Sequence, residues 1–349
     1  MKIVSKCIVI DKRSGQSTLQ KLNDADLLDL KLKIFSKNEF LYIPIKNVEN
    51  LPEILQNLDF KIQDEGFESR NLKPYSLKNS LLGKIPQDLL VHIPRSFDQI
   101  GDLIIIDIPK ELSEFKSVIG QDLMHIYPTT MSVFNKTSRV DGEYRIRSVE
   151  LISGSGETST IHRENGIRLH VDISNSYFSP RLSFEHRRIM DLVTPGDKVL
   201  DMFAGIGPFS VLIAKNIESE ITAVDINPYA VENLRKSIKL NRSYLGSVIS
   251  VVVDANQLLE KFDPNSKFDK IIMNHPSGAI NYLKTATMLL SDDGIIFCYV
   301  FAPKKSQQEY CKNLIAETVG ERFTFKNVTQ VRNYSAFDDH VCIAIEKSA

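Results

Sequence analysis

The segment Asp201–Pro208, with the sequence Asp-Met-Phe-Ala-Gly-Ile-Gly-Pro, has the residue types of a turn that joins a strand to a helix around a nucleotide-like cofactor. Gly205 and Gly207 allow positive φ angles and a close approach of the backbone to a ligand. Pro208 suits the first position of a helix, where the missing N–H is not needed. In parallel sheets, ligands bind beside such a turn at the carboxyl ends of the strands. We therefore expect the site to be built around this turn.

Two acidic residues follow the turn at spacings that suit a cofactor with ribose and adenine groups. Asp225 ends the next expected strand, where a carboxylate can accept hydrogen bonds from two ribose hydroxyls. Asp254 ends the third expected strand, where it can accept a hydrogen bond from the adenine amino group. We also expect Phe203 and Ile226, which neighbour the turn and the first of these acids, to contact the cofactor.

The residues of the turn favour one of two cofactor classes. The pattern G-x-G-x-x-G of dinucleotide-binding proteins lacks its third glycine here, because the chain has Phe-Ser-Val at 209–211. The acidic Asp201 repels a pyrophosphate but attracts a sulfonium cofactor that also carries an α-ammonium group. The turn therefore predicts S-adenosylmethionine as cofactor, with a nicotinamide oxidoreductase as the alternative.

Composition places few limits on the class of protein. The 349 residues are 42% hydrophobic and 25% charged, which is ordinary for a globular protein and allows two or three domains. The four cysteines are scattered, so we expect no disulfide scaffold, no metal site and a reducing compartment, namely the cytoplasm. No apolar run resembles a signal peptide or reaches the ~18 residues of a membrane span, so we expect no membrane partner.

Three domains are predicted along the chain. Strand-like residues 3–10 and 40–45, with helix-like residues 17–28, indicate a small α/β unit. Polar residues from Asp64 to Pro74 suggest a linker, and residues 103–108 form the clearest strand of a second unit. The predicted boundaries are 1–68 for an N-terminal domain, 74–165 for a middle domain and 166–349 for a catalytic domain.

From about Ser179 onward, short apolar strands alternate with amphipathic helices. The expected strands are residues 198–200, 221–225, 248–253, 270–273 and 295–301, and the expected helices include residues 209–215 and 280–290. This alternation predicts an α/β fold with a doubly wound parallel sheet that is covered by helices on both faces.

The chain resembles the archaeal-eukaryotic tRNA guanosine-37 N1-methyltransferase family, which has a class I, Rossmann-type methyltransferase fold preceded by smaller domains. The matching segments are Gly142–Arg147, Thr160–Gly166, Val171–Ile173, Tyr177–Leu182, Asp201–Ser210, Val224–Pro228 and Met273–Pro276. The resemblance implies S-adenosylmethionine as cofactor and, as partner, a tRNA with G at position 37. We expect the protein to act as a monomer.

The resemblance also implies roles for individual residues. Guanine N1 carries a proton, so its methylation needs a base, and negative charge then develops on O6. By resemblance Glu185 is the base and Arg145 stabilises O6. Asn274 and Pro276 orient the flipped guanine, and Tyr177 packs near the methionine end of the cofactor or near the target base.

Arg181, His186 and His275 are also expected to contact the substrate, with exposure to solvent as the alternative for His275. His275 departs from the family pattern, which more often has a small or apolar residue between the asparagine and the proline. Its presence leaves the identity of the base more open than the reaction class.

Each catalytic assignment has a structural alternative. The acidic Glu185 can instead serve only to complement a helix dipole, because acids are common in the first turn of a helix. Arg145 can instead form a surface ion pair with Glu143 or Glu150. Asn274 can simply satisfy the turn after its strand.

The net charge of −1 gives no overall basic surface for RNA. Arginines nevertheless gather in the middle of the chain, at positions 139, 145, 147, 163, 168, 181, 187 and 188. Most are expected to lie on a mixed solvated surface. Related alternatives are aminocarboxypropyl transfer from the same cofactor, methylation of a tricyclic guanosine and, from another class, RNA binding without turnover.

Overall fold

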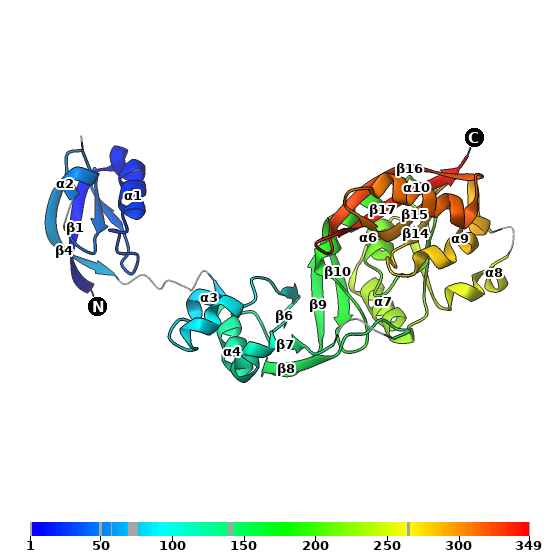
Figure 1. Cartoon of the computed structure of the whole chain (residues 1–349), viewed down its shortest axis with the longest axis horizontal. Coiled ribbons are helices and arrows are strands. Elements are labelled where there is room, and N and C mark those ends of the chain that lie inside the picture. Colours follow the sequence, from blue (N-terminus) through cyan, green and yellow to red (C-terminus); the bar gives the residue numbers. More distant parts are fainter. Residues whose placement is uncertain are drawn as a thin grey trace. The chain divides into compact units, whose positions relative to one another are not determined.

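The computed structural model describes residues 2–48, 51–56, 58–68, 76–138, 142–263 and 266–348. Its contacts divide the chain into two compact units, residues 1–80 and 81–349 (Figure 1). The division into three domains stays a prediction, because these units do not separate residues 81–165 from the rest. Among the helices of the described ranges, none has the length and hydropathy needed to cross a bilayer. Arg139 lies outside the described residues.

The first unit is a small antiparallel sheet with one longer helix. Its elements are β1 (Lys2–Asp11), α1 (Gly15–Asp24), β2 (Phe35–Lys37), β3 (Phe40–Pro44), α2 (Leu51–Ile54), β4 (Lys61–Glu68) and α3 (Leu77–Ser80), and the strand order is β2-β3-β1-β4. The predicted linker is wrong for residues 64–68, which belong to β4 and pair with β1. These residues are polar because β4 is an edge strand with mostly exposed side chains. Residues 69–74 lie outside the described ranges.

The second unit begins with a four-stranded sheet and a hairpin. The sheet, in the order β5-β6-β7-β8, contains β5 (Asp98–Ile100), β6 (Leu103–Ile106), β7 (Ser132–Lys136) and β8 (Val149–Gly154), and α4 (Lys116–Ile126) packs on it. The predicted strand at 103–108 is confirmed but ends at Ile106. The antiparallel hairpin of β9 (Ser159–Glu164) and β10 (Ile167–Asp172) then leads to the large sheet.

The large sheet has seven strands in the order β13-β12-β11-β14-β15-β17-β16. They are β11 (Lys198–Asp201), β12 (Glu220–Asp225), β13 (Ser247–Val252), β14 (Phe268–Met273), β15 (Leu290–Pro303), β16 (Phe323–Asn333) and β17 (Asp338–Lys347). The first five strands in this order are parallel, as predicted. The expectation of an entirely parallel sheet is wrong at β17 and β16, because these strands form a hairpin and β17 pairs antiparallel with both neighbours.

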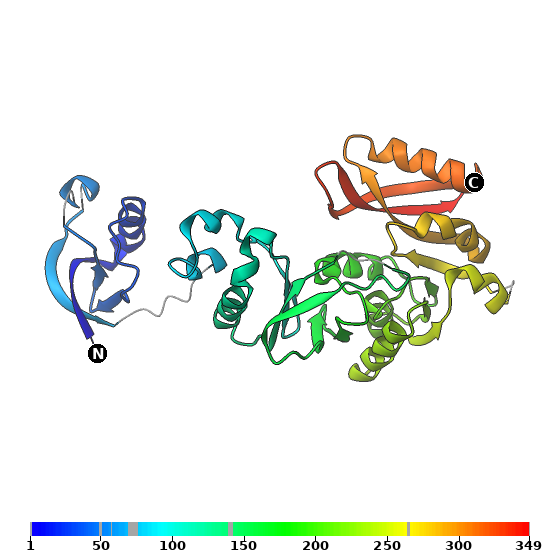
Figure 2. The same ribbon diagram turned by 60° about the horizontal axis from the view of Figure 1, so that its bottom comes forward.

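Helices cover both faces of this sheet, as the alternating pattern predicts (Figure 2). They are α5 (Ser183–Met190), α6 (Pro208–Asn216), α7 (Pro228–Leu240), α8 (Leu258–Lys261), α9 (Leu283–Leu289) and α10 (Gln307–Val319). Residues of β10, α5, α6 and α7 form one core with Phe297 and Tyr299 of β15. Residues of α8, α9 and α10 form the other core with Ile296 and Cys298. Successive residues of β15 therefore face opposite cores.

The turn between β11 and α6 has the backbone that its glycines predict. Gly205 and Gly207 have φ angles of 55° and 80°, which are in the left-handed region. A Cβ atom on Gly207 would lie 2.1 Å from Cδ1 of Leu234 in α7, whereas one on Gly205 would have only Tyr177 O at 3.8 Å. Gly207 is thus required both by its conformation and by the close packing of α6 on α7.

Replacing Gly207 with alanine is expected to lower the free energy of unfolding by ~2–5 kcal/mol, because a left-handed alanine costs ~1–2 kcal/mol and an overpacked core costs ~1–3 kcal/mol. Denaturant unfolding followed by circular dichroism measures this loss. Gly196→Ala is the matched control, since Gly196 has φ 92° but no atom within 4 Å of a new Cβ. Equal losses in the two variants would contradict the role of packing.

Candidate active site

A cleft of about 1190 Å³ lies at the carboxyl ends of β11, β12 and β14. It collects most of the residues that the sequence singled out. The lining includes Arg145, Tyr177, His186, Phe203, Gly205, Asp225, Ile226, Asp254, Asn274, His275 and Pro276. Glu185, Asp201, Gly207 and Arg181 were also predicted, but they are not among the lining residues.

The cofactor side of the cleft is organised around Asp225. Its Oδ2 accepts a hydrogen bond from the Gly205 N–H at 2.7 Å, and its Oδ1 accepts one from the Asn227 N–H at 2.9 Å. Each oxygen keeps a further lone pair for a ribose hydroxyl. Burial raises the pKa of this carboxyl. A carboxylate fixed beside an open glycine turn fits the ribose of S-adenosylmethionine.

Asn227 is a lining residue that the sequence reasoning missed. It caps α7 by accepting a hydrogen bond from Tyr229 N at 3.0 Å, and its Nδ2 donates to Asn175 O at 2.8 Å. An asparagine directly before a proline at a helix start is a recognisable capping signal. That signal indicates the helix but not the contact with a ligand.

Asp201 lies beneath the turn rather than in the cleft. Its side chain is fully buried, and its Oδ2 accepts a hydrogen bond from Ser210 Oγ at 2.7 Å. Burial raises its pKa to about 7, and the nearby Asp225 also raises it. Asp201 therefore has no oxygen exposed to the cleft and is linked through Ser210 to the helix that follows the turn.

Arg145 and the loop after β14 form the opposite side of the cleft. Arg145 has a φ angle of 52°, and its Nη1 donates a hydrogen bond to Ser277 Oγ. It forms no ion pair within the described ranges, and Glu150 pairs instead with Lys116 at 2.6 Å. The alternative of a surface ion pair with Glu150 is therefore wrong.

His275 lies between the cofactor turn and Arg145. Its ring meets that of Phe203 edge to face, with centroids 5.1 Å apart, and its buried Nδ1 has no hydrogen-bond partner in the part of the chain that the structure describes. Burial lowers the pKa of His275, and the Arg145 guanidinium lowers it further. A Cβ atom on Gly278 would lie 2.7 Å from the imidazole, so the loop needs glycine there to accommodate this ring. His275 thus presents a neutral ring to the cleft.

Glu185 is held behind the cleft wall. Its carboxylate accepts two hydrogen bonds from Arg188, at 2.6 and 2.7 Å, and one from Tyr299 Oη at 2.6 Å. The side chain is buried, and burial together with this carboxylate raises the pKa of Tyr299. Tyr299 in turn contacts His340, which lines the cleft. Glu185 is therefore close to the cleft, but both of its oxygens already have partners.

The other predicted substrate contacts are also tied to acidic groups. His186 Nδ1 lies 2.6 Å from Glu164 Oε1, and hydrogen bonds from His162 and His186 outweigh burial and lower the pKa of Glu164 to about 2. Arg181 donates to Asp98 Oδ1 at 2.6 Å. These pairs connect β5 and β9 to the segment that carries α5.

The C-terminal strands supply a wall that the sequence reasoning missed entirely. Phe301, Arg332, Tyr334 and His340 all line the cleft. They come from β15, β17, the end of β16 and the residue that follows it. No local motif marks them, because their proximity depends on the pairing of the three strands.

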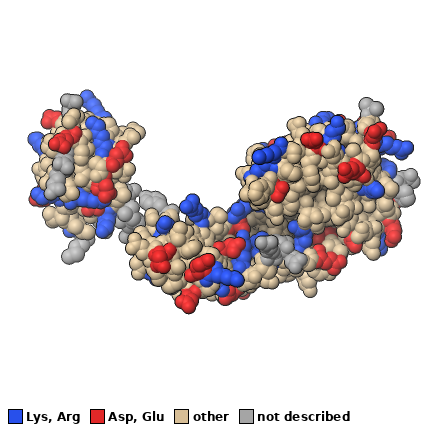
Figure 3. All heavy atoms as spheres, viewed as in Figure 1, with Lys and Arg blue, Asp and Glu red and all other residues tan. Residues whose placement is uncertain are grey.

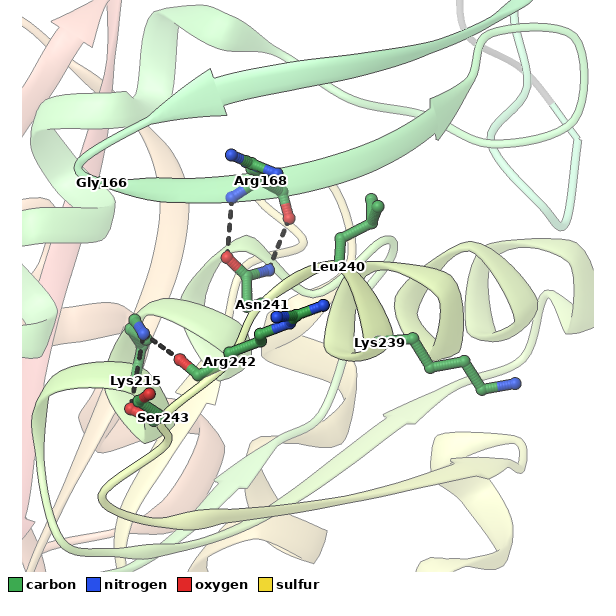
Figure 4. Close-up of a pocket in the computed structure, with 8 residues that line it drawn as sticks. All are labelled: Gly166, Arg168, Lys215, Lys239, Leu240, Asn241, Arg242 and Ser243. Carbon is green, nitrogen blue, oxygen red and sulfur yellow. Dashed lines mark hydrogen bonds between the residues drawn. The ribbon is translucent and has the colours of Figure 1, made fainter.

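On the face drawn in Figure 3, basic residues do not gather into one broad surface. Figure 3 shows lysine and arginine atoms mixed with acidic atoms on the visible face. A second depression of about 550 Å³, where α6 and α7 end, is lined by Arg168, Lys215, Lys239 and Arg242. In Figure 4 the free cations point in different directions, and Lys215 donates to the carbonyl oxygens of Arg242 and Ser243. These cations complement two helix C-termini and do not converge on a ligand.

Comparisons with known proteins agree with this arrangement. The family model of the TRM5/TYW2 methyltransferase domain matches residues 160–325. Models of the TYW2 N-terminal domain and the tRNA methyltransferase 5 N-terminal domain match residues 77–158 and 7–51. The tRNA (guanine(37)-N(1))-methyltransferase Trm5b of Pyrococcus abyssi is 33% identical over 96% of this chain and 97% of its own length. The Trm5b of Methanocaldococcus jannaschii is 37% identical over 84% and 85%.

Solved structures give the same result. Wild-type Trm5b from Pyrococcus abyssi has a TM-score of 0.76 and 32% identity, with 99% of this chain and 100% of that chain covered. The complex of aTrm5 with tRNALeu also has a TM-score of 0.76 and 32% identity, with 98% and 99% covered. Methanocaldococcus jannaschii Trm5 in complex with adenosine has a TM-score of 0.64 and 32% identity, with 99% of each chain covered.

The sheet, the glycine turn and these matches define an S-adenosylmethionine-dependent methyltransferase of the TRM5/TYW2 class. Within this class, the chain belongs to the tRNA (guanine(37)-N(1))-methyltransferase family. The predicted family, fold class, enzyme class and cofactor are thereby confirmed.

Replacing Asp201 with asparagine is expected to flatten the dependence of stability on pH. Because its pKa is about 7 when folded and about 4 when unfolded, the folded chain binds the extra proton. The contribution of Asp201 to stability is therefore greatest below about pH 4 and falls until about pH 7, by at most about 4 kcal/mol. Unfolding free energies at several pH values measure this. If the asparagine variant kept the same decline, Asp201 would not be its source.

Proposed function

We propose that this protein transfers the methyl group of S-adenosylmethionine to N1 of guanosine 37 in tRNA. The observation that carries the proposal is the hydrogen bond from Arg145 to Ser277, because it joins the Arg145 loop to the loop of Asn274 and Pro276 beside the cofactor turn. The relatives of 33% and 37% identity are named for this reaction, and a relative of 32% identity was solved with tRNALeu.

The chain's residues divide between the two reactants. Gly205, Asp225, Ile226 and Asp254 hold the cofactor, which when bound supplies an electrophilic methyl group. Asn274, whose side-chain amide has no hydrogen bond among the described residues, orients the guanine together with Pro276. The target base is unstacked and flipped to enter this cleft.

Arg145 is proposed to stabilise O6. As the N1 proton leaves, negative charge moves to O6, and a guanidinium is a permanent cation with several donors. One donor of Arg145 is used by Ser277, which leaves others for the base. No carboxylate of the described residues pairs with Arg145, so its charge is not neutralised by a neighbour.

Glu185 is proposed as the group that accepts the N1 proton. Its carboxylate accepts a hydrogen bond from Tyr299, a residue of the wall behind the cleft, and forms a bidentate pair with Arg188. To act as a base, the carboxylate has to exchange one of these partners for the guanine. The alternative role, complementing the dipole of α5, does not require the contacts with Arg188 and Tyr299.

The proposed reaction is tested with S-adenosylmethionine labelled separately in its methyl and aminocarboxypropyl groups. The full chain is incubated with tRNA carrying G or A at position 37, and the nucleosides are analysed by mass spectrometry. Methyl label at N1 of G37, and no label on the A37 tRNA, is expected. Aminocarboxypropyl label would instead identify the alternative transferase, and label on the A37 tRNA would refute the choice of base.

The role of Glu185 is tested by single-turnover rates. Glu185→Gln is expected to slow methyl transfer by roughly 10²–10⁴-fold, the usual contribution of a general base. Arg188→Gln is the matched control, because it breaks the same ion pair but leaves the carboxylate. Thermal melting of both variants checks folding. If both variants lost activity equally, Glu185 would act by positioning α5 rather than as the base.

A further inference from the structure

Three neighbouring strands place one side chain each in a row along the cleft. Phe301 of β15 is the direct partner of His340 in β17, and His340 is the direct partner of Arg332 in β16. Directly opposed residues of paired strands project from the same face. A β-bulge between Gln330 and Arg332 interrupts the pairing beside this row, and such bulges re-aim side chains near binding sites. All three members of the row line the cleft.

The polar members of the row lack hydrogen-bond partners within the described ranges. His340 is 1% exposed, and neither of its ring nitrogens has a partner. The Nε of Arg332 is also buried without a partner, and no ion pair involves this guanidinium among the described residues. Burial and Arg332 lower the pKa of His340 to about 4, so its ring is neutral. A buried polar group without a partner is unfavourable, and a ligand that supplies the missing hydrogen bond would remove this penalty.

An aromatic pair lies beside the polar row. The rings of Phe301 and Tyr334 are stacked, with centroids 3.7 Å apart and planes at 22°. Tyr334 is 56% exposed, so this stacked pair presents an aromatic ring to solvent. Aromatic rings of this kind stack the unpaired bases of single-stranded nucleic acids.

The position of the row excludes the cofactor as its ligand. Adjacent strands lie ~4.8 Å apart. Arg332 in β16 is three strands from β14 and five from β12, which bears Asp225. These separations correspond to ~14 Å from the proposed base pocket and ~24 Å from the proposed ribose site. The row therefore lies on the substrate side, beyond the flipped base.

We propose that Arg332, His340 and Tyr334 form a subsite for the nucleotide next to the methylated one. Arg332 and the His340 N–H bind the phosphate that joins the two nucleotides, and the neighbouring base stacks on Tyr334. The proposal rests on the proposed function, since it assigns the surroundings of the same flipped guanosine. It adds a contact that holds the anticodon loop while the target base leaves its stack.

The stacking contact is tested by combining a protein variant with an RNA change. Binding of full-length chain to tRNA is measured for wild type, Tyr334→Ala and the control Tyr334→Phe, using intact tRNA and tRNAs abasic at position 36 or 38. Tyr334→Ala is expected to weaken binding of intact tRNA by roughly 5- to 150-fold, as for loss of one stacked base. With one of the abasic tRNAs, wild type and Tyr334→Ala should bind within about twofold, while Tyr334→Phe resembles wild type throughout.

The phosphate contact is tested by the dependence of binding on salt. Arg332→Gln should make the slope of log affinity against log salt shallower by ~0.7–0.9, the value for one phosphate, and Arg332→Lys should retain the slope. The subsite would be overturned if the slope is unchanged in Arg332→Gln, or if Tyr334→Ala loses the same affinity for all three tRNAs. Methylation of the same tRNAs is scored separately. If the effect of Tyr334→Ala depends on the abasic position but N1 is not methylated, only the proposed function is refuted. If N1 is methylated but the effect of Tyr334→Ala is the same on every tRNA, only the subsite is refuted.

Discussion

The cleft depends on the two backbone hydrogen bonds that hold the Asp225 carboxylate. The N–H groups of Gly205 and Asn227 bind its two oxygens and so join the turn after β11 to the start of α7. Positive φ at Gly205 and the absence of a side chain at Gly207 are what allow this geometry. The same hydrogen bonds hold the carboxyl ends of the adjacent strands β11 and β12 beside each other. The next strands of the sheet, from β14 to β16, then place the other lining residues relative to these two strand ends.

The cofactor half of the site was predictable because its residues follow local rules. A glycine turn, an acid at the end of the next strand and the alternation of strands and helices together place Gly205, Asp225 and Asp254 at one edge. The resemblance added Arg145 and Asn274, which no spacing rule brings together. Their proximity arises from tertiary contacts: β5 contacts the β9–β10 hairpin, β10 packs on α6 and α7, and Arg145 bonds to Ser277 in the loop after β14.

Other features were beyond sequence reasoning for identifiable physical reasons. The burial of Asp201 depends on α6 closing over it, and a motif does not report accessibility. The pairing of Glu185 with Arg188 and Tyr299 joins α5 to a strand more than a hundred residues away. The C-terminal wall depends on β17 inserting between β15 and β16, a strand order that periodicity does not encode. In each case a non-local arrangement determines the chemistry.

The position of β17 also has a consequence for biosynthesis. During translation, β11 to β15 emerge before residues 338–347, so β15 has an open hydrogen-bonding edge until β17 arrives. Open edges of this kind pair readily with other chains. A nascent chain with a formed cofactor turn would still lack Arg332 and His340. The cofactor turn can therefore form before the proposed RNA subsite is complete, and β17 both covers the edge of β15 and supplies part of the cleft wall.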